Sequence, residues 1–196
     1  AAARNGHFEI VHYLIKHGAN AADNTPLVIA CEYGHLEVVK AFIESANGRN
    51  GNDNTMALKE YMNQEGKDSH GRGRTPLMVA ARNGHFGIVH YLIKCGANAA
   101  GTPLVCACEN GRFRDVKLLI ASHDVNGSNS NMTLKEMVNQ VNENSYDYPP
   151  RSPLIAAANN KHQIIVDYLV DIAYADETKL VRKYKKEFPY GTPLVC

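Results

Sequence analysis

The sequence predicts an all-α solenoid built from stacked helix–turn–helix units. A Thr/Ser-Pro-Leu tripeptide recurs along the chain, a Gly turn follows most copies, and apolar residues then recur with helical spacing. The tripeptides begin at Thr25, Thr75, Thr102, Ser152 and Thr192. Such internal similarity is typical of repeat proteins, in which each unit buries its apolar face against its neighbours.

The unit that begins at Thr75 shows the pattern most clearly. Thr75 is expected to cap the first helix, and Pro76 is tolerated in the first turn because its missing N–H has no partner there. The apolar run 77–81 is the body of that helix, and Gly84 supplies the positive φ that ends it. The apolar positions of 86–93 then predict a second helix.

The units alternate in length. The Pro residues of the tripeptides are spaced by 50, 27, 50 and 40 residues, so a block of two units returns after 77 residues. The predicted repeats cover about 1–23, 24–73, 74–100, 101–150 and 151–190, with a partial one at 191–196, in a single array over 1–196. Because 1–8 resembles the middle of a unit, we expect the chain to be a piece of a longer array.

The motifs resemble those of the ankyrin-repeat family. Thr75-Pro76-Leu77 opens the first helix, Gly84-His85 joins the two helices, and Gly96-Ala97-Asn98 follows the second helix. The resemblance implies a helix–turn–helix followed by a β-hairpin-like finger in each repeat, and a curved stack with a concave face. It also implies that another protein binds that face.

The sequence departs from the family pattern at the residue after the tripeptide. There the resemblance implies a His that ties neighbouring repeats, but this chain has Val28, Met78, Val105 and Ile155. Apolar packing is expected to supply the tie instead. Two connections are also short for an ankyrin repeat of about 33 residues, since one unit spans only 27.

The two longer connections are helix-bearing insertions, at about 46–74 and 124–151. The first predicts a helix from Thr55 with Leu58, Tyr61 and Met62 on one side; the second predicts one over 132–142 with Leu134, Met137, Val138 and Val141 on one face. Two interpretations stay open: each helix packs on its own repeats, or the pair forms a ledge that binds a partner.

The segment after the last repeat predicts a basic helix over 177–187, carrying Lys179, Arg182, Lys183, Lys185 and Lys186. A solvated helix face is the favoured interpretation, and contact with nucleic acid or anionic lipid is the alternative. The formal charge of the chain is +1, from 21 basic and 20 acidic residues, which gives no general attraction to nucleic acid. No apolar run approaches the roughly 20 residues that span a membrane.

Nothing in the sequence indicates catalysis, a cofactor or a metal. His7, His35, His85 and His162 share the Gly-turn position, where capping of the second helix explains them. Cys106 and Cys108 point about 200° apart on a helix, so we do not expect them to share a metal. Five cysteines do not form a disulfide scaffold. Reduced thiols favour an intracellular protein, cytoplasmic or nuclear.

The resemblance places the partner-binding row at the residue before each Thr-Pro and at the two residues before each Gly turn. These positions are polar and varied, as recognition residues are, and Tyr33, Arg74, Arg82 and Arg151 are the best candidates because Tyr and Arg are favoured anchors. The predicted row is Arg4, Asn5, Asn24, Glu32, Tyr33, Arg74, Arg82, Asn83, Glu109, Asn110, Arg151, Asn159 and Asn160.

The predicted function is therefore that of a protein–protein interaction scaffold which is not an enzyme. The alternative is a regulatory or targeting region of a larger enzyme, channel or ubiquitin-ligase adaptor whose active part lies outside this sequence. The sequence does not decide between these two classes, and it leaves the oligomeric state open.

Overall fold

The chain divides into two compact units, Ala1–Asn98 and Ala99–Cys196. In this computed structural model the described residues are 1–19, 24–48, 55–98, 102–125, 134–139, 141 and 151–173. The predicted basic helix over 177–187 and the partial repeat at 191–196 lie outside the described residues. Each unit is described by itself below.

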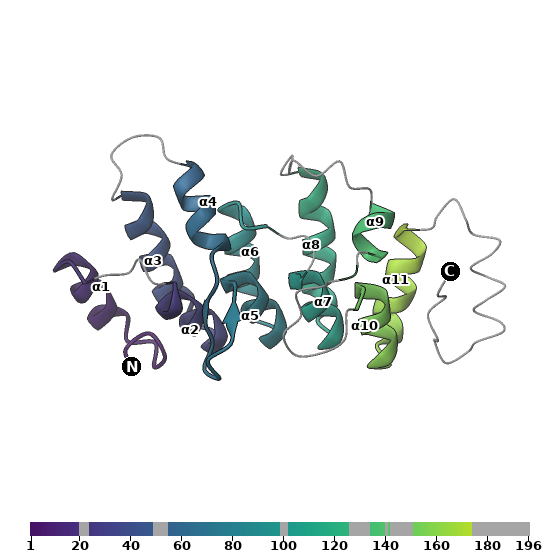
Figure 1. Cartoon of the computed structure of the whole chain (residues 1–196), viewed down its shortest axis with the longest axis horizontal. Coiled ribbons are helices and arrows are strands. Elements are labelled where there is room, and N and C mark those ends of the chain that lie inside the picture. Colours follow the sequence, from purple (N-terminus) through teal and green to yellow (C-terminus); the bar gives the residue numbers. More distant parts are fainter. Residues whose placement is uncertain are drawn as a thin grey trace. The chain divides into compact units, whose positions relative to one another are not determined.

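The first unit consists of helix pairs with a hairpin between two of them (Figure 1). Helices α2 and α5 pack on each other, and α3 contacts both α1 and α6. Leu27, Leu77 and Leu92 are fully or almost fully buried between them. The elements are α1 (Phe8–Lys16), α2 (Thr25–Tyr33), α3 (Leu36–Gly48), α4 (Thr55–Asn63), β1 (Gly66–Lys67), β2 (Gly73–Arg74), α5 (Pro76–Asn83) and α6 (Phe86–Lys94).

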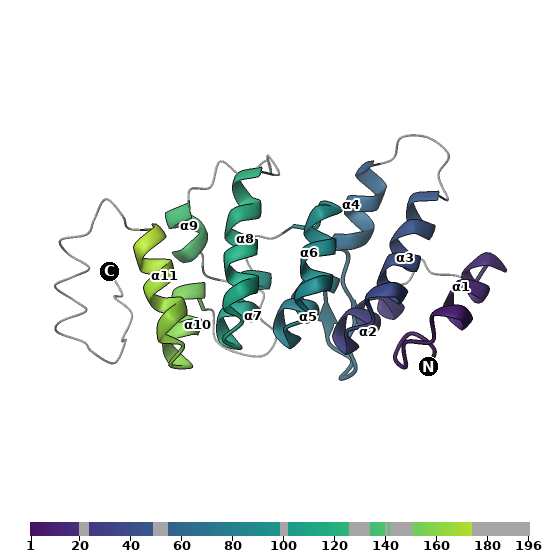
Figure 2. The ribbon, with the colours of Figure 1, turned by 180° about the vertical axis from the view of Figure 1, so that it is seen from behind.

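The second unit repeats the helix order of the first (Figure 2). The first helix of each of its repeats, α7 and α10, packs on the other, as α2 and α5 do in the first unit. The elements are α7 (Thr102–Glu109), α8 (Phe113–Val125), α9 (Leu134–Asn139), α10 (Pro153–Asn159) and α11 (Gln163–Ala173). Helix α7 begins 77 residues after α2, and α10 begins 77 residues after α5, so the sequence block is also a structural block. The predicted all-α class is confirmed.

Capping of the first helices follows the prediction at two tripeptides and differs at a third. The hydroxyls of Thr75 and Ser152 accept from the N–H groups of Met78 and Ile155, both at 3.3 Å. Thr25 instead lies inside α2, and its Oγ1 accepts from the N–H of Lys67 at 3.0 Å. The hairpin insertion therefore takes the hydroxyl that would otherwise cap α2.

The Gly-turn histidines do not act as side-chain caps, and that prediction is wrong. Neither His7 nor His85 caps its helix through the side chain. The Nε2 of His85 lies 2.9 Å from the carbonyl oxygen of Glu32, in the preceding repeat. His35 and His162 make the same contact one repeat back, to the carbonyl oxygens of Arg4 and Glu109, at 2.8 and 3.0 Å.

These contacts also correct the expectation that packing alone ties neighbouring repeats. A carbonyl oxygen only accepts, so Nε2 carries the proton and donates. Each imidazole also lies against the Gly of the preceding repeat: an added Cβ on Gly34 would lie 2.7 Å from His85 Cε1. Gly in the turn thus serves two needs, since it takes a φ of 84° and leaves room for the next repeat's ring.

Both insertions carry the predicted helix, and each helix packs on its own unit. Helix α4 contacts α3 and α5, and α9 contacts α10 and α11. Met62 in α4, and Met137 and Val138 in α9, are fully buried. Of the predicted span 132–142, the structure describes α9 over Leu134–Asn139 and Val141, which lies outside the helix and is exposed, so Val141 is not part of the apolar face.

Candidate interaction surface

At three equivalent positions of the first unit a pair of residues precedes a Gly with positive φ, namely Gly6, Gly34 and Gly84. Gly34 and Gly84 stop α2 and α5, so the two side chains before each of them project from the last turn of a helix. The pair before Gly6 lies in the turn that precedes α1. The pairs are Arg4 and Asn5, Glu32 and Tyr33, and Arg82 and Asn83.

Arg4 and Tyr33 form one cluster, although they lie in successive repeats. The Nε of Arg4 donates to the Tyr33 hydroxyl at 3.0 Å, and the guanidinium carbon lies 5.1 Å from the centre of the ring. Both residues are exposed, Tyr33 to 42%. A guanidinium stacked on an aromatic face gains cation–π attraction and loses side-chain freedom before any partner arrives.

Glu32 anchors the hairpin to the end of α2. Its two carboxylate oxygens accept from Ser69, one from the backbone N–H at 2.8 Å and one from the hydroxyl at 2.6 Å. Strands β1 and β2 pair antiparallel, Gly66 with Arg74, which makes the short finger that the family resemblance implied. This finger lies along α2, since Lys67 contacts the start of α2 and Ser69 its end.

Asp68 organises the turn of the finger. Its Oδ1 accepts from the N–H groups of His70 and Arg72, and its Oδ2 accepts from the Arg72 guanidinium, all at 2.9 Å. Burial opposes ionisation of this carboxyl, but the hydrogen bonds and the Arg72 charge outweigh it and lower the pKa of Asp68. Asp68 is therefore an ionised part of the finger's own hydrogen-bond network.

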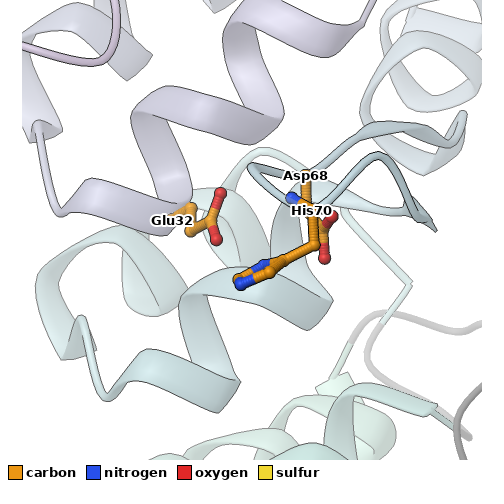
Figure 3. A group of neighbouring side chains, drawn as sticks. All are labelled: Glu32, Asp68 and His70. Atoms are coloured by element: carbon orange, nitrogen blue, oxygen red, sulfur yellow. Dashed lines mark hydrogen bonds between the residues drawn. The ribbon is translucent and has the colours of Figure 1, made fainter.

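The side chains of Glu32, Asp68 and His70 come together at the finger, with their ligand-type atoms within 4.8 Å of one another (Figure 3). This grouping has the residue types of a metal site. Its carboxylates, however, already accept from Ser69 and from Arg72, and the Arg72 guanidinium lies 3.4 Å from His70 Nδ1. A cation there would face a fixed positive charge, so we interpret the group as the structural link between finger and helix.

Two residues of the predicted row are buried instead of exposed. Asn24 donates its amide to the carbonyl oxygen of Gln64, and Arg74 is buried within β2, a strand of the finger itself. Both stand before a Thr-Pro, where the chain leaves an insertion or a short connection and enters α2 or α5. Their place is in the support of the finger, so they do not belong to an accessible surface.

The asparagines of the row differ in how much they are tied to their own helix. The side-chain amides of Asn83, Asn110 and Asn160 donate to carbonyl oxygens one turn earlier, at 2.8, 2.9 and 2.8 Å. Each caps the C-terminal end of its helix in this way and remains exposed. Asn5 and Asn159 are exposed as well.

In the second unit the row begins with an ion pair. Arg151 Nη1 lies 3.7 Å from Glu109 Oε1, and both side chains are half-buried. Glu109 and Arg151 stand 77 residues after Glu32 and Arg74. In both units the glutamate at the end of a first helix is bound by a residue of the connection to the next repeat: Ser69 binds Glu32, and Arg151 binds Glu109. These two residues therefore support each other before any partner is considered.

The sequence reasoning missed the finger's own contribution to this surface. Ser69, His70 and Arg72 lie beside the end of α2, and His70 is exposed. The run Asp68-Ser69-His70-Gly71 does indicate a turn, because Asp, Ser and Gly are residues that turns favour. Nothing local in that run indicated that it folds back on Glu32, 37 residues earlier.

Helix pairs tied by turn histidines, with a hairpin finger and an exposed polar row, define a class of helical repeat protein. The family model of ankyrin repeats in three copies matches residues 1–55 and 48–131. This chain belongs to the ankyrin-repeat family. Ankyrin repeats are generally protein–protein interaction modules and are typically not catalytic.

Several curated proteins are similar to parts of the chain. It is 34% identical over 89 residues to alpha-latrotoxin-Lh1a of Latrodectus hasselti, which covers 45% of this chain and 5% of the toxin. It is 24% identical over 148 residues to a putative ankyrin repeat protein of Acanthamoeba polyphaga mimivirus, covering 74% and 35% of the two chains. It is 29% identical over 165 residues to the ankyrin repeat and KH domain-containing protein mask-1 of Caenorhabditis elegans, covering 70% and 6%.

The chain thus spans about a third or less of the length of these relatives. Among the helices that the structure describes, none has the length and apolar character needed to cross a bilayer.

Proposed function

We propose that this chain is a scaffold module that binds another protein through the helix-end row, the exposed residues that directly precede its Gly turns. The observation that supports the proposal is the Arg4–Tyr33 cluster, which is exposed and lies outside the buried core of the helix pairs. Tyr and Arg are enriched at interface anchors, and these two side chains already contact each other across successive repeats.

The proposed surface of the first unit consists of Arg4, Asn5, Tyr33, Arg82 and Asn83, beside the finger. Glu32 borders it but is engaged by Ser69. In the second unit the exposed candidates are Asn110, Asn159 and Asn160, with Glu109 and Arg151 at the border. The positions vary in chemistry from repeat to repeat, which suits recognition of one particular partner.

The experiment that tests the proposal is a selection of peptides from a random display library against the full chain. The affinity of the selected peptides is then measured by calorimetry for the chain and for the double variant Tyr33→Ala, Arg82→Ala. We expect the variant to bind at least tenfold more weakly, with unchanged helicity and melting, because the side chains removed lie outside the core.

A matched double variant at exposed positions of second helices, His90→Ala with Lys94→Ala, is the control and is expected to bind normally. Selected peptides that bind the Tyr33 variant and the control equally well would remove the helix-end row as the binding surface.

The insertion helices are a second candidate for the contact surface. Helix α4 buries Met62 and turns Lys59, Glu60 and Asn63 outward. The packing of α4 on α3 and α5 fixes the position of these side chains, as a recognition ledge requires. The triple variant Lys59→Ala, Glu60→Ala, Asn63→Ala in the same calorimetric assay distinguishes the two surfaces, because only one of the two variants is expected to lose affinity.

The second candidate function is a regulatory or targeting region of a larger enzyme, channel or ubiquitin-ligase adaptor. It is favoured by the small share, 5 to 35%, of the relatives' length that the chain covers. The complete reading frame tests it: a catalytic or channel-forming domain in the same frame supports this role, and a frame of repeats alone contradicts it.

The proposal includes an intracellular location, cytoplasmic or nuclear. Cys31, Cys106 and Cys108 are reduced cysteines buried in the helix pairs, and burial raises the pKa of Cys31 and Cys108 far above the usual range. Neutral buried thiols pack as small apolar groups, which suits a reducing compartment. Localisation of a tagged full-length protein by microscopy tests this part of the proposal.

A further inference from the structure

The geometry of the exposed Arg4–Tyr33 cluster also indicates which chemical group of the partner it would bind. We propose that it binds a carboxylate, and that the partner therefore presents an acidic segment, rich in Asp and Glu, to the first unit. This inference rests on the proposed function, because it assumes that the helix-end row is the contact surface. It adds the class of ligand that the row recognises.

The first step of the argument is the state of the Arg4 guanidinium. Its Nε donates to the Tyr33 hydroxyl at 3.0 Å, and its central carbon lies over the ring, 5.1 Å from the centroid. Among the described residues, no carboxylate pairs with Arg4. The two terminal Nη groups thus remain available for a ligand.

The second step is the chemistry of that arrangement. A guanidinium is a planar fork whose paired N–H groups match the two oxygens of a carboxylate. Holding the fork on a ring in advance reduces the entropy that binding would otherwise cost. The backbone carbonyl of Arg4 is also fixed, by the Nε2–H of His35 at 2.8 Å, so both ends of this residue are positioned before a ligand arrives.

The third step is the balance of charge beside the cluster. The nearby acidic groups are already engaged: Glu32 accepts from Ser69 with both oxygens, and Asp68 pairs with Arg72. Both Glu32 oxygens and the Asp68 carboxylate are thus held in the hydrogen bonds of the finger, so neither side chain competes with a ligand for the Arg4 guanidinium.

The surface suits an acidic protein segment better than a nucleic acid. Binding to a nucleic acid is favoured by many phosphate contacts and by several aromatic rings on which bases stack. The row of the first unit offers one exposed ring, Tyr33, on a chain whose formal charge is only +1. One ring with one oriented guanidinium fits the side chain of a single Asp or Glu within a short acidic stretch.

The experiment uses fluorescence anisotropy with the full chain and three labelled twelve-residue peptides of identical layout. One peptide alternates Glu with Gly, one alternates Gln with Gly, and one alternates Lys with Gly. The Glu peptide is expected to bind at least tenfold more tightly than the other two, and its affinity is expected to fall as salt is raised, because the contact is ionic.

Variants then locate the contact. Arg4→Gln removes the charge and the fork and is expected to weaken binding of the Glu peptide about tenfold, the loss typical of one charge-assisted bidentate contact. Arg4→Lys keeps the charge but not the fork, so an intermediate loss is expected. Lys94→Gln removes the same charge from an exposed position of α6 and is expected to have no effect.

Circular dichroism and thermal melting of each variant show whether the fold is kept. Equal binding of the Glu and Gln peptides, or equal losses for Arg4→Gln and Lys94→Gln, would overturn the inference. The display-selected peptides keep this outcome separate from a failure of the proposed function. If they are not acidic but still depend on Tyr33, the row remains the binding surface and only the acidic partner class is wrong.

Discussion

The imidazole of His85 donates to the carbonyl oxygen of Glu32, with 2.9 Å between Nε2 and O. The two residues lie 53 positions apart in the sequence and belong to successive repeats. The ring also fills the space above Gly34, where an added Cβ would lie 2.7 Å away. One side chain thus satisfies a helix-terminal carbonyl and packs on the turn beside it.

The variant His85→Ala is expected to reduce the free energy of unfolding by about 1–3 kcal/mol. It removes a hydrogen bond from a part-buried carbonyl and leaves a void above Gly34. Urea unfolding followed by circular dichroism measures the change. His90→Ala, on the exposed side of α6 where the ring stacks on Phe86, is the control and is expected to change stability by about 0.5 kcal/mol or less. Similar losses in the two variants would contradict the assigned role of His85.

Lys161 stands where the other repeats have Gly, and it takes a positive φ of 61°. A side chain in this left-handed region is strained by about 1–2 kcal/mol. We therefore expect Lys161→Gly to raise the free energy of unfolding by about 1 kcal/mol. Lys161→Ala keeps a Cβ and is expected to give no such gain. Differential scanning calorimetry compares the two variants, and an equal gain in both would show that the Lys side chain, not its φ, is the cause.

Asp115 occupies a position of α8 that corresponds to Ile88 in α6 and Ile165 in α11, and its side chain is only 2% exposed. Its Oδ1 has no hydrogen-bond partner among the described residues. Burial raises the pKa of Asp115 from 3.8 to about 6, against the opposing effect of Arg112. The folded state therefore resists ionisation of this carboxyl.

The sign of the pH dependence follows from that raised pKa. Below pH 3.8 the Asp115 carboxyl is protonated in both the folded and the unfolded state, so its burial does not lower the free energy of unfolding through ionisation. As pH rises from 3.8 towards 6 only the unfolded state ionises readily, so stability is lost, and above 6 the loss stays near its full size of about 3 kcal/mol.

The variant Asp115→Asn lacks this titration. The difference in unfolding free energy between variant and wild type is expected to grow by about 3 kcal/mol between about pH 4 and pH 7 in favour of the variant. Urea denaturation over that range measures the difference. The exposed Glu60→Gln is the control and is expected to give a constant difference. A constant difference for Asp115→Asn as well would show that the buried carboxyl does not titrate as proposed.

Leu92 and Leu14 occupy the same position in the second helices of two repeats but differ in burial. Leu92 in α6 is 0% exposed, and Leu14 in α1 is 46% exposed. Leu92→Ala is expected to cost about 2–5 kcal/mol, because it leaves a cavity in the core. Leu14→Ala is expected to cost less than about 1 kcal/mol. Chemical denaturation of the two variants compares them, and equal costs would mean that Leu14 is as well packed as Leu92.

Local patterns predicted the helix pairs and most of their ends. The Thr75 cap, the left-handed Gly34 and Gly84, and the insertion helix α4 all follow from residues within one or two turns of each other. Such features depend on backbone sterics and on hydrogen bonds to near neighbours, so the sequence reports them directly. The family resemblance added the finger, which the pairing of β1 with β2 confirms.

Long-range contacts were not predictable in the same way. Asn24 and Arg74 are polar and precede a Thr-Pro, as surface residues would, yet both are buried, Asn24 at the start of α2 and Arg74 within β2. The His35, His85 and His162 rings turn to the preceding repeat instead of their own helices. A side chain's partner is set by which elements pack together, and the pattern around each residue contains no information about that packing.

The sequence by itself determined the repeat class, the alternation of short and long units and most of the places where helices begin and end. Only the tertiary structure decided which polar residues remain exposed. It set Arg4 against Tyr33 at the surface and bound Glu32 to the finger, although Arg4 and Glu32 both stand two residues before a Gly with positive φ. The reason is physical: helix formation is decided within a few residues, whereas exposure depends on chain segments tens of residues away.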